Sequence, residues 1–140
     1  MSHRFWITTA GVWGAISVAL GAFGAHGLPK FLEDAGFSPE AIASRLATYE
    51  TGARYQLYAA LALLAVSAAG RCTSRVWSAA AWQWLVGSLI FSGCCYALAI
   101  VDGYRWLGAI VPIGGVLMIT GWLTVAVAAK TEPRPSGSDQ

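Results

Sequence analysis

The sequence predicts an all-α protein, a four-helix transmembrane bundle with an amphipathic helix between helices one and two. Hydrophobic residues make up 56% of the 140 residues and charged residues only 11%, well below the roughly 25% that is usual in soluble proteins. The charges are also segregated, which leaves long uncharged runs, and a helix needs about 20 apolar residues to cross a bilayer. We therefore expect one domain, 1–129, with spans at about 5–27, 54–70, 76–101 and 105–129.

The first span carries small residues at helical spacing, and these are Gly14, Ser17, Gly21 and Gly24. Steps of three and four residues place them on one face. In lipid, small side chains let a second helix approach closely, so this face predicts a packing seam. The run is longer than the roughly 7–15 apolar residues of a cleaved signal. Pro29 disfavours a helical residue before it and ends the span.

The connection 29–53 is polar and begins a new helix at Ser38-Pro39-Glu40, where Ser is the N-cap and Pro the first helical residue. Apolar residues then recur at steps of four and three, at Ile42, Leu46 and Tyr49. This spacing predicts an amphipathic helix over 38–53. It either lies on the membrane surface or runs straight into span two, with Gly52 as a possible bend.

Span two has only 16 uncharged residues, but Arg54 and Arg71 at its ends can extend their charges toward the interfaces. Span three has a second small-residue stripe that includes Ser88 and Ser92. The three cysteines form neither a zinc spacing nor a CxxC pair, so we expect packing roles for them. Span four contains a helix break at Pro112, Gly114 and Gly115. The Pro- and Ser-rich tail, 130–140, is predicted to be disordered.

Four spans place both termini and the loop 71–75 on one side of the membrane. That side holds five Lys or Arg residues and the other side four. The positive-inside rule counts these residues, so a margin of one favours cytoplasmic termini in a bacterial inner membrane. Six of the seven tryptophans fall toward the terminal side, as in an interfacial belt.

The opposite side gathers polar groups near the ends of three spans. The candidate polar cluster consists of His26, Arg54, Gln56, Tyr58 and Tyr96. A neutral histidine can bind a metal, relay a proton or accept a hydrogen bond. Alternatively, these groups satisfy one another and fix how the helices meet. One histidine is too few for a metal site, so no metal, cofactor or catalytic residue is predicted.

Several short motifs follow one another in a familiar order, and these are Leu20 to Gly27, Tyr55-Gln56-Leu57-Tyr58 with Leu61 to Leu64, Phe91-Ser92-Gly93 with Tyr96, Pro112 to Gly115, and Gly121-Trp122. In this the chain resembles domain-of-unknown-function family 423, the transmembrane protein 256-like small membrane proteins, over about residues 5–129. The resemblance implies four helices and a bacterial inner membrane or an organelle, and no activity. The family often has His where this chain has Ala59, so a pairing of that His with His26 is absent here.

The sequence contains no Ser-His-Asp set, paired intramembrane carboxylates or nucleotide loop, so we expect no enzyme. The first functional hypothesis is a structural or accessory subunit that packs with itself or with a larger membrane complex. The alternative is a small-solute or ion transporter or channel component, suggested by the break in span four. A third is association of the 38–53 helix with lipid or a soluble protein. A net charge of +2 does not suggest nucleic acid.

Overall fold

The computed structural model describes residues 3–69, 71 and 74–131, and the regular elements in this part are all helical. They are α1 (His3–His26), α2 (Leu28–Asp34), α3 (Pro39–Ala68), α4 (Arg75–Ile100), the short 3-10 helix η2 (Arg105–Ala109) and α5 (Val111–Thr131). The all-α prediction is therefore confirmed. Lys130 and Thr131 belong to α5 rather than to a tail, and 132–140 lie outside the described residues.

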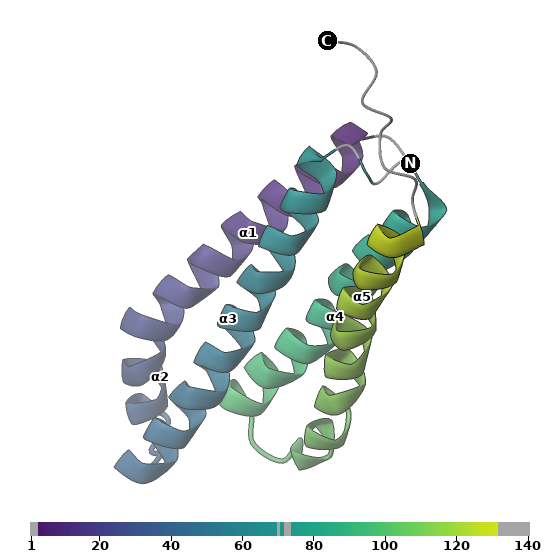
Figure 1. Ribbon diagram of the computed structural model, residues 1–140. Helices are drawn as coiled ribbons and strands as arrows, with labels where there is room; N and C mark the ends of the chain where they lie inside the picture. Colours follow the sequence, from purple (N-terminus) through teal and green to yellow (C-terminus); the bar gives the residue numbers. More distant parts are fainter. Residues whose placement is uncertain (1–2, 70, 72–73, 132–140) are drawn as a thin grey trace.

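The four long helices run alternately up and down, and both ends of the chain lie at the same end of the molecule (Figure 1). Consecutive long helices are neighbours: α1 packs along α3, α3 along α4, and α4 along α5. The two central helices are thus α3 and α4, with α1 and α5 on the flanks. This order gives an open four-helix arrangement in which the flanking helices each have one main neighbour.

Among the described residues, three helices are long and apolar enough to cross a membrane: His3–His26, Arg75–Ile100 and Arg105–Lys130. The charged N-terminal half of α3 keeps that helix out of this group. However, α1 and α4 run in the same direction (Figure 1). If both cross the bilayer, the chain between them must return across it, and α3 is the long helix that does so.

The amphipathic helix and span two form one continuous helix, α3, without a break at Gly52. Ser38 caps its start by accepting a hydrogen bond from the backbone N–H of Ala41 at 3.3 Å. A glycine inside a helix bends it only if packing favours the bend, and here Gly52 lies tightly against α4.

The sequence analysis missed α2. This helix begins after Gly27 with Pro29 in its first turn, a position that tolerates the missing N–H. Leu28 and Leu32, four residues apart, are fully buried against a cluster that includes Tyr49 and Ala99. A turn follows in which Gly36 has φ +83°, a conformation that favours glycine.

The break expected at Pro112, Gly114 and Gly115 is displaced toward the N-terminus. The irregular residues precede Pro112, between η2 and α5, and Pro112 is the second residue of α5. Proline is accepted there because the first-turn N–H groups have no partner within the helix. Gly114 and Gly115 are helical and serve packing instead.

The core at the terminal end joins all four long helices. It contains three of the tryptophans, Trp6, Trp77 and Trp84, together with alanines of α3 and α4 and Met118 of α5. Trp6 and Trp84 are at most 1% exposed. The tryptophans of this end are therefore only partly an interfacial belt, because their large rings also fill the space between helices.

Helices α4 and α5 approach each other closely at two glycines, Gly87 and Gly114. A Cβ on Gly114 would lie 2.6 Å from the backbone N of Phe91 and 2.7 Å from the carbonyl oxygen of Gly87. Both are backbone atoms, so they cannot rotate away. Glycine at this position lets the two backbones touch, as small residues do in membrane helix pairs.

We expect Gly114→Ala to separate α4 from α5 and to lower the free energy of unfolding by about 1–3 kcal/mol, the usual effect of overpacking. Gly115→Ala is the matched control, since its Cβ would meet the Phe91 ring at an ordinary 3.8 Å. Thermal unfolding in mild detergent measures both. Equal midpoints for the two variants would show that the approach is not constrained.

Candidate functional site

A buried amide joins three helices in the middle of the molecule. Gln56 of α3 is 1% exposed. Its Nε2 donates to the backbone carbonyl of Trp13 in α1 at 3.3 Å, and its Oε1 accepts from the hydroxyl of Tyr96 in α4 at 2.8 Å. Both ends of the amide are thereby paired, as a polar group in hydrocarbon requires.

Serines of the two small-residue stripes reach the backbone of α3. Ser17 of α1 donates to the carbonyl of Ala53 at 2.8 Å. Ser92 of α4 donates to the carbonyl of Gly52 at 2.7 Å. These two acceptors are adjacent in the chain, so α1 and α4 are both tied to the same turn of α3.

A further contact crosses directly from α1 to α4. The indole Nε1 of Trp13 donates to the Ser88 hydroxyl at 3.0 Å, and that hydroxyl donates to the Leu85 carbonyl at 3.1 Å. The Trp13 indole and its backbone carbonyl thus belong to one polar network with Gln56 and Tyr96. The sequence analysis missed Trp13, which it assigned only to an interfacial belt.

The glycines of the first seam lie against α3 to different degrees. A Cβ on Gly24 would lie 2.7 Å from the Tyr49 ring, and one on Gly14 would meet Ala60 at 3.7 Å. A Cβ on Gly21 would meet nothing within 4 Å. The seam is therefore closed at Gly24 and open at Gly21.

The structure brings together two of the five residues of the candidate polar cluster, Gln56 and Tyr96. His26 ends α1 and is exposed. Tyr58 is 49% exposed and packs against Tyr55, and the exposed Arg54 pairs with Glu50.

Helical geometry explains the separation. Positions 54 and 58 share the outer face of α3, whereas position 56 is rotated by about 200° from each and points inward. The sequence analysis grouped these residues because they are near one another in the chain. The rotation of successive residues around the axis of α3 places them on different faces of the helix.

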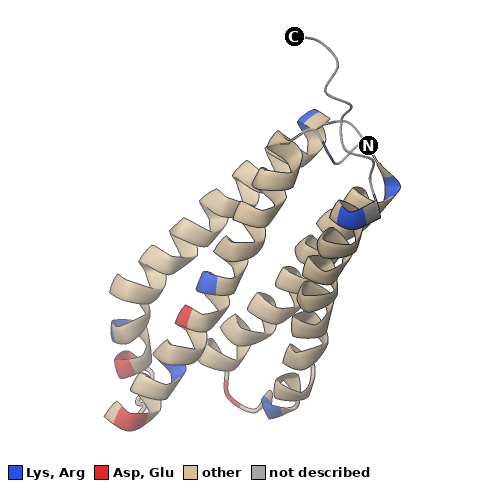
Figure 2. Cartoon of the chain, viewed as in Figure 1, with Lys and Arg blue, Asp and Glu red and all other residues tan. Residues whose placement is uncertain are grey.

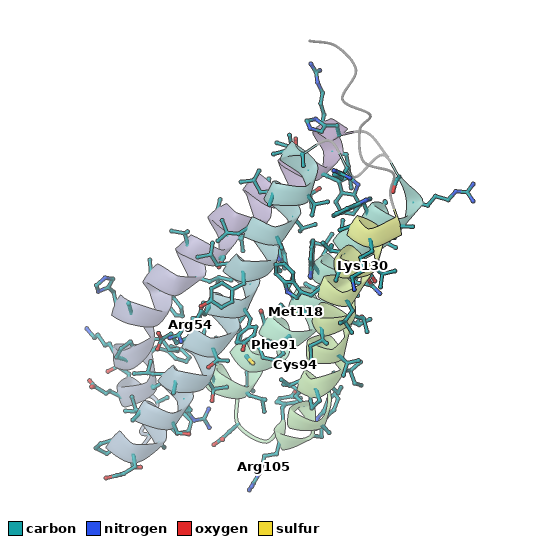
Figure 3. All side chains as sticks on the ribbon, viewed as in Figure 1. Arg54, Phe91, Cys94, Arg105, Met118 and Lys130 are labelled. Carbon is teal, nitrogen blue, oxygen red and sulfur yellow. The ribbon has the colours of Figure 1, made fainter. Side chains whose placement is uncertain are left out.

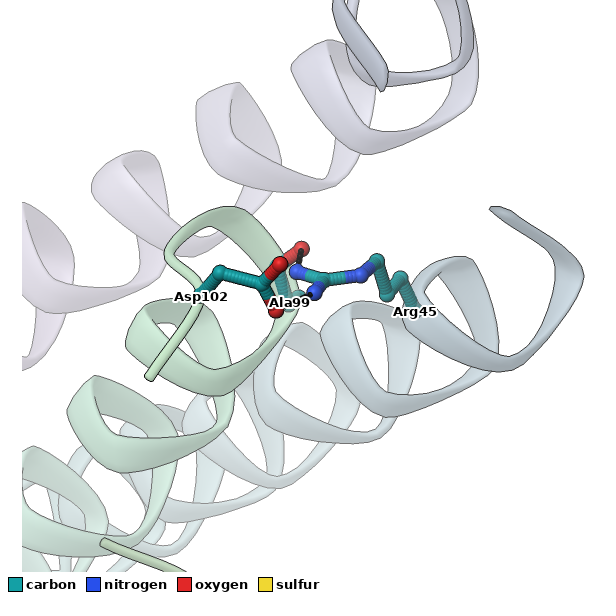
Figure 4. A network of polar contacts seen from close by, with 3 residues as sticks. All are labelled: Arg45, Ala99 and Asp102. Atoms are coloured by element: carbon teal, nitrogen blue, oxygen red, sulfur yellow. Dashed lines mark hydrogen bonds and ion pairs between the residues drawn. The ribbon is translucent and has the colours of Figure 1, made fainter. Parts of the chain in front are cut away.

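A second polar contact, missed from the sequence, ties the start of α3 to the end of α4 (Figure 4). One guanidinium nitrogen of Arg45 donates to the carbonyl of Ala99 at 3.0 Å, and another pairs with Asp102 at 2.5 Å. The guanidinium also lies 3.9 Å from the Phe37 ring centre. Arg45 thereby satisfies a carbonyl that the end of a helix leaves unpaired. In the sequence, the Asp102-Gly103 turn after span three was the feature that could have indicated this contact.

The described residues contain no group of three His, Cys, Asp or Glu side chains placed to hold a metal ion. Within the same part of the chain, the buried indole Nε1 atoms of Trp6 and Trp84 have no hydrogen-bond partner. The polar network around Gln56 consists of neutral groups that pair with one another. What this arrangement can do chemically is hold α1, α3 and α4 in a fixed relation.

Comparison with known proteins places this geometry in a family. A family model described as "Protein of unknown function (DUF423)" matches residues 20–115. The chain belongs to this family. That range contains Gln56 and Tyr96. It also contains Gly52 and Ala53, whose carbonyls accept the hydrogen bonds from Ser92 and Ser17. The family resemblance seen in the sequence is thus confirmed.

Relatives that carry the name UPF0382 membrane protein occur in bacteria and in a yeast. The protein of Haemophilus influenzae is 36% identical over 126 residues, which cover 90% of this chain and 93% of the relative. YwdK of Bacillus subtilis is 34% identical over 90% of this chain and 96% of its own length. A relative from Schizosaccharomyces pombe is 35% identical over 84% and 95%. No solved structure matches. Because it belongs with these membrane proteins, the chain is a membrane protein.

Tyr96→Phe removes the donor to Gln56 and leaves a buried amide oxygen unpaired. We expect a loss of about 1 kcal/mol in the free energy of unfolding, since hydrogen bonds between membrane helices contribute modestly. Tyr58→Phe is the control, because its side chain lies on the outer face of α3. Reversible unfolding in mixed micelles compares the two. An effect of Tyr58→Phe as large as that of Tyr96→Phe would contradict the network.

Proposed function

We propose that the protein is a structural or accessory subunit that packs with itself or with a larger membrane complex. The observation that carries this proposal is the open arrangement of the helices. Only 11% of the most apolar stretch of α1 and 17% of that of Arg105–Lys130 are buried within the chain, against 33% for α4. The two flanking helices therefore present long apolar faces to the membrane, available to other helices.

The interior supports the same proposal. Gln56 pairs there with Trp13 and Tyr96, and small residues bring the helix backbones together. A network of this kind stabilises one relative position of three helices. A rigid framework with apolar flanks suits a protein whose role is to pack against others.

The alternative, a small-solute or ion transporter or channel component, has less support. It rested on an expected break in span four that faces the same end of the molecule as His26 and Tyr96. The break lies before Pro112, and the helical Gly114 is packed against Phe91 and Gly87. Broken helices mark binding sites in transporters when their free backbone groups line a cavity, and the backbone at Gly114 is covered by α4.

For location, we propose a bacterial inner membrane with the termini in the cytoplasm. Among the described residues the terminal end carries cations without acids, namely Arg4, Arg71, Arg75 and Lys130, whereas the other end mixes both signs (Figure 2). Two cations of that other end, Arg45 and Arg54, are paired with acids. Over the whole sequence the terminal side has five Lys or Arg residues and the other side four, and an excess of these residues is typical of the cytoplasmic side of bacterial membrane proteins.

Fusions to the C-terminus test this orientation. In a bacterial host we expect a fluorescent protein fused after Gln140 to be bright and alkaline phosphatase fused there to be inactive, because the phosphatase needs an oxidising exterior to form disulfides. The opposite pair of results would reverse the proposed orientation.

The packing role predicts a particle larger than one chain. We expect native mass spectrometry of gently extracted protein to show more than one copy or a stably bound second membrane subunit. Val18→Trp on α1 and Leu123→Trp on α5 place large side chains on exposed positions of the flanking helices, at 63% and 59% exposure. Each should reduce the associated fraction.

Leu61→Trp is the matched control, since Leu61 is 54% exposed on the central helix α3. It should leave the associated fraction unchanged. A strictly monomeric wild-type particle, with no subunit recovered in pulldowns from native membranes, would remove the proposal.

A further inference from the structure

A cleft of about 400 Å³ opens between the end of α1 and the first half of α3. Its walls are small on the α1 side, at Gly21, Gly24 and Ala25, and include Tyr49 and Ala53 of α3. A Cβ on Gly21 would meet nothing within 4 Å, so the space beside it is open. Its volume is within the roughly 300–1,000 Å³ of small-molecule sites.

One carboxylate lines this otherwise mostly apolar cleft. It belongs to Glu50, which pairs with Arg54 one turn along α3. The two side chains remain 68% and 54% exposed, so both can bind a further group. Figure 3 labels Arg54 on α3, at the level of the last turns of α1, and this residue borders the cleft through its contact with Glu50.

The position of this pair along α3 indicates its depth in the membrane. A crossing of about 20 residues that ends at Ala68 begins near Tyr49. Glu50 and Arg54 therefore lie at the outer margin of the hydrocarbon on the side opposite the termini. The backbone of Arg54 lies one turn, about 6 Å, nearer the bilayer centre than that of Glu50, while the charged groups of the two side chains are in contact.

This pair of opposite charges matches a phospholipid with a primary amine in its head group, which also carries one charge of each sign. In phosphatidylethanolamine the phosphate is attached to the glycerol, next to the hydrocarbon, and the ammonium is at the outer end. Arg54 supplies donors for the phosphate, which arginine binds through parallel N–H groups. Glu50 supplies a carboxylate that can accept hydrogen bonds from the ammonium.

We propose that the α1–α3 cleft binds one phosphatidylethanolamine molecule, with its ammonium on Glu50, its phosphate on Arg54 and an acyl chain against Gly21. The site is separate from the Gln56 network and does not depend on the proposed packing role. Phosphatidylcholine has no N–H donor for Glu50. Phosphatidylglycerol has no cation for it and leaves the carboxylate facing an anionic lipid.

Native mass spectrometry of the delipidated full-length protein tests this site. The protein is mixed with dioleoyl forms of phosphatidylethanolamine, phosphatidylcholine and phosphatidylglycerol in separate samples. We expect at least fivefold more retained phosphatidylethanolamine than either of the others. Glu50→Gln should bring its retention to within twofold of phosphatidylcholine, while Glu40→Gln, an exposed acid in the first turn of α3, should not.

A second pair of variants tests the cleft itself. Gly21→Leu fills it, and retention of phosphatidylethanolamine should fall at least fivefold. Gly11→Leu is the matched control, because a Cβ on Gly11 of the same helix also meets nothing within 4 Å, and it should retain the lipid. Both variants are first checked for a single symmetric peak in size-exclusion chromatography.

Three results would overturn the proposal. Equal retention of the three lipids by the wild-type protein would mean nonselective lipid contact, and a preference for phosphatidylglycerol would mean that Arg54 acts alone. A change in copy number with Gly21→Leu, without a change in lipid retention, would make the cleft an interface between copies. If Gly21→Leu does not fold, the Glu50→Gln and Glu40→Gln comparison decides.

Discussion

The rest of the structure depends on the way α1 and α4 are held to one turn of α3. Ser17 and Ser92 donate to the neighbouring carbonyls of Ala53 and Gly52 from opposite sides. In hydrocarbon these hydroxyls have no water as an alternative partner, so each finds one within the protein. The distance over which a serine can reach a backbone carbonyl then requires small residues at the contact, which explains why serine stands in a stripe of small residues on both α1 and α4.

The Gln56 network adds direction to these contacts. Because its amide has a donor end and an acceptor end, Gln56 pairs correctly only if the Trp13 carbonyl and the Tyr96 hydroxyl lie on their own sides. Apolar packing alone would permit sliding of one helix along another, whereas a satisfied polar network favours one register. Arg45 performs a similar task at the far end, where it connects α3 to the carbonyl of Ala99 in the last turn of α4 and to Asp102 in the turn after it.

The two ends of the molecule differ in what their charges can do. The terminal end carries cations among tryptophans, several of which are buried as part of the core. The opposite end carries ion pairs, one of which, Glu50 with Arg54, borders a cleft that α1 leaves open at Gly21. Small residues one turn apart on α1 thus have different surroundings: Gly24 lies against the Tyr49 ring, whereas the space beside Gly21 is open.

The sequence by itself determined the all-helical architecture, the antiparallel order and the face of each helix that carries small residues. Composition and a period of 3.6 are local properties, and a membrane leaves the backbone few alternatives to a helix. It could not decide which polar residues meet. Arg54 and Tyr58 were grouped with Gln56 by nearness in sequence, yet the phase of α3 turns them outward, and the partners of Gln56 come from 43 and 40 residues away. Tertiary structure decided those pairings, together with the start of α5 at Val111, because they depend on how whole helices are rotated and placed against one another.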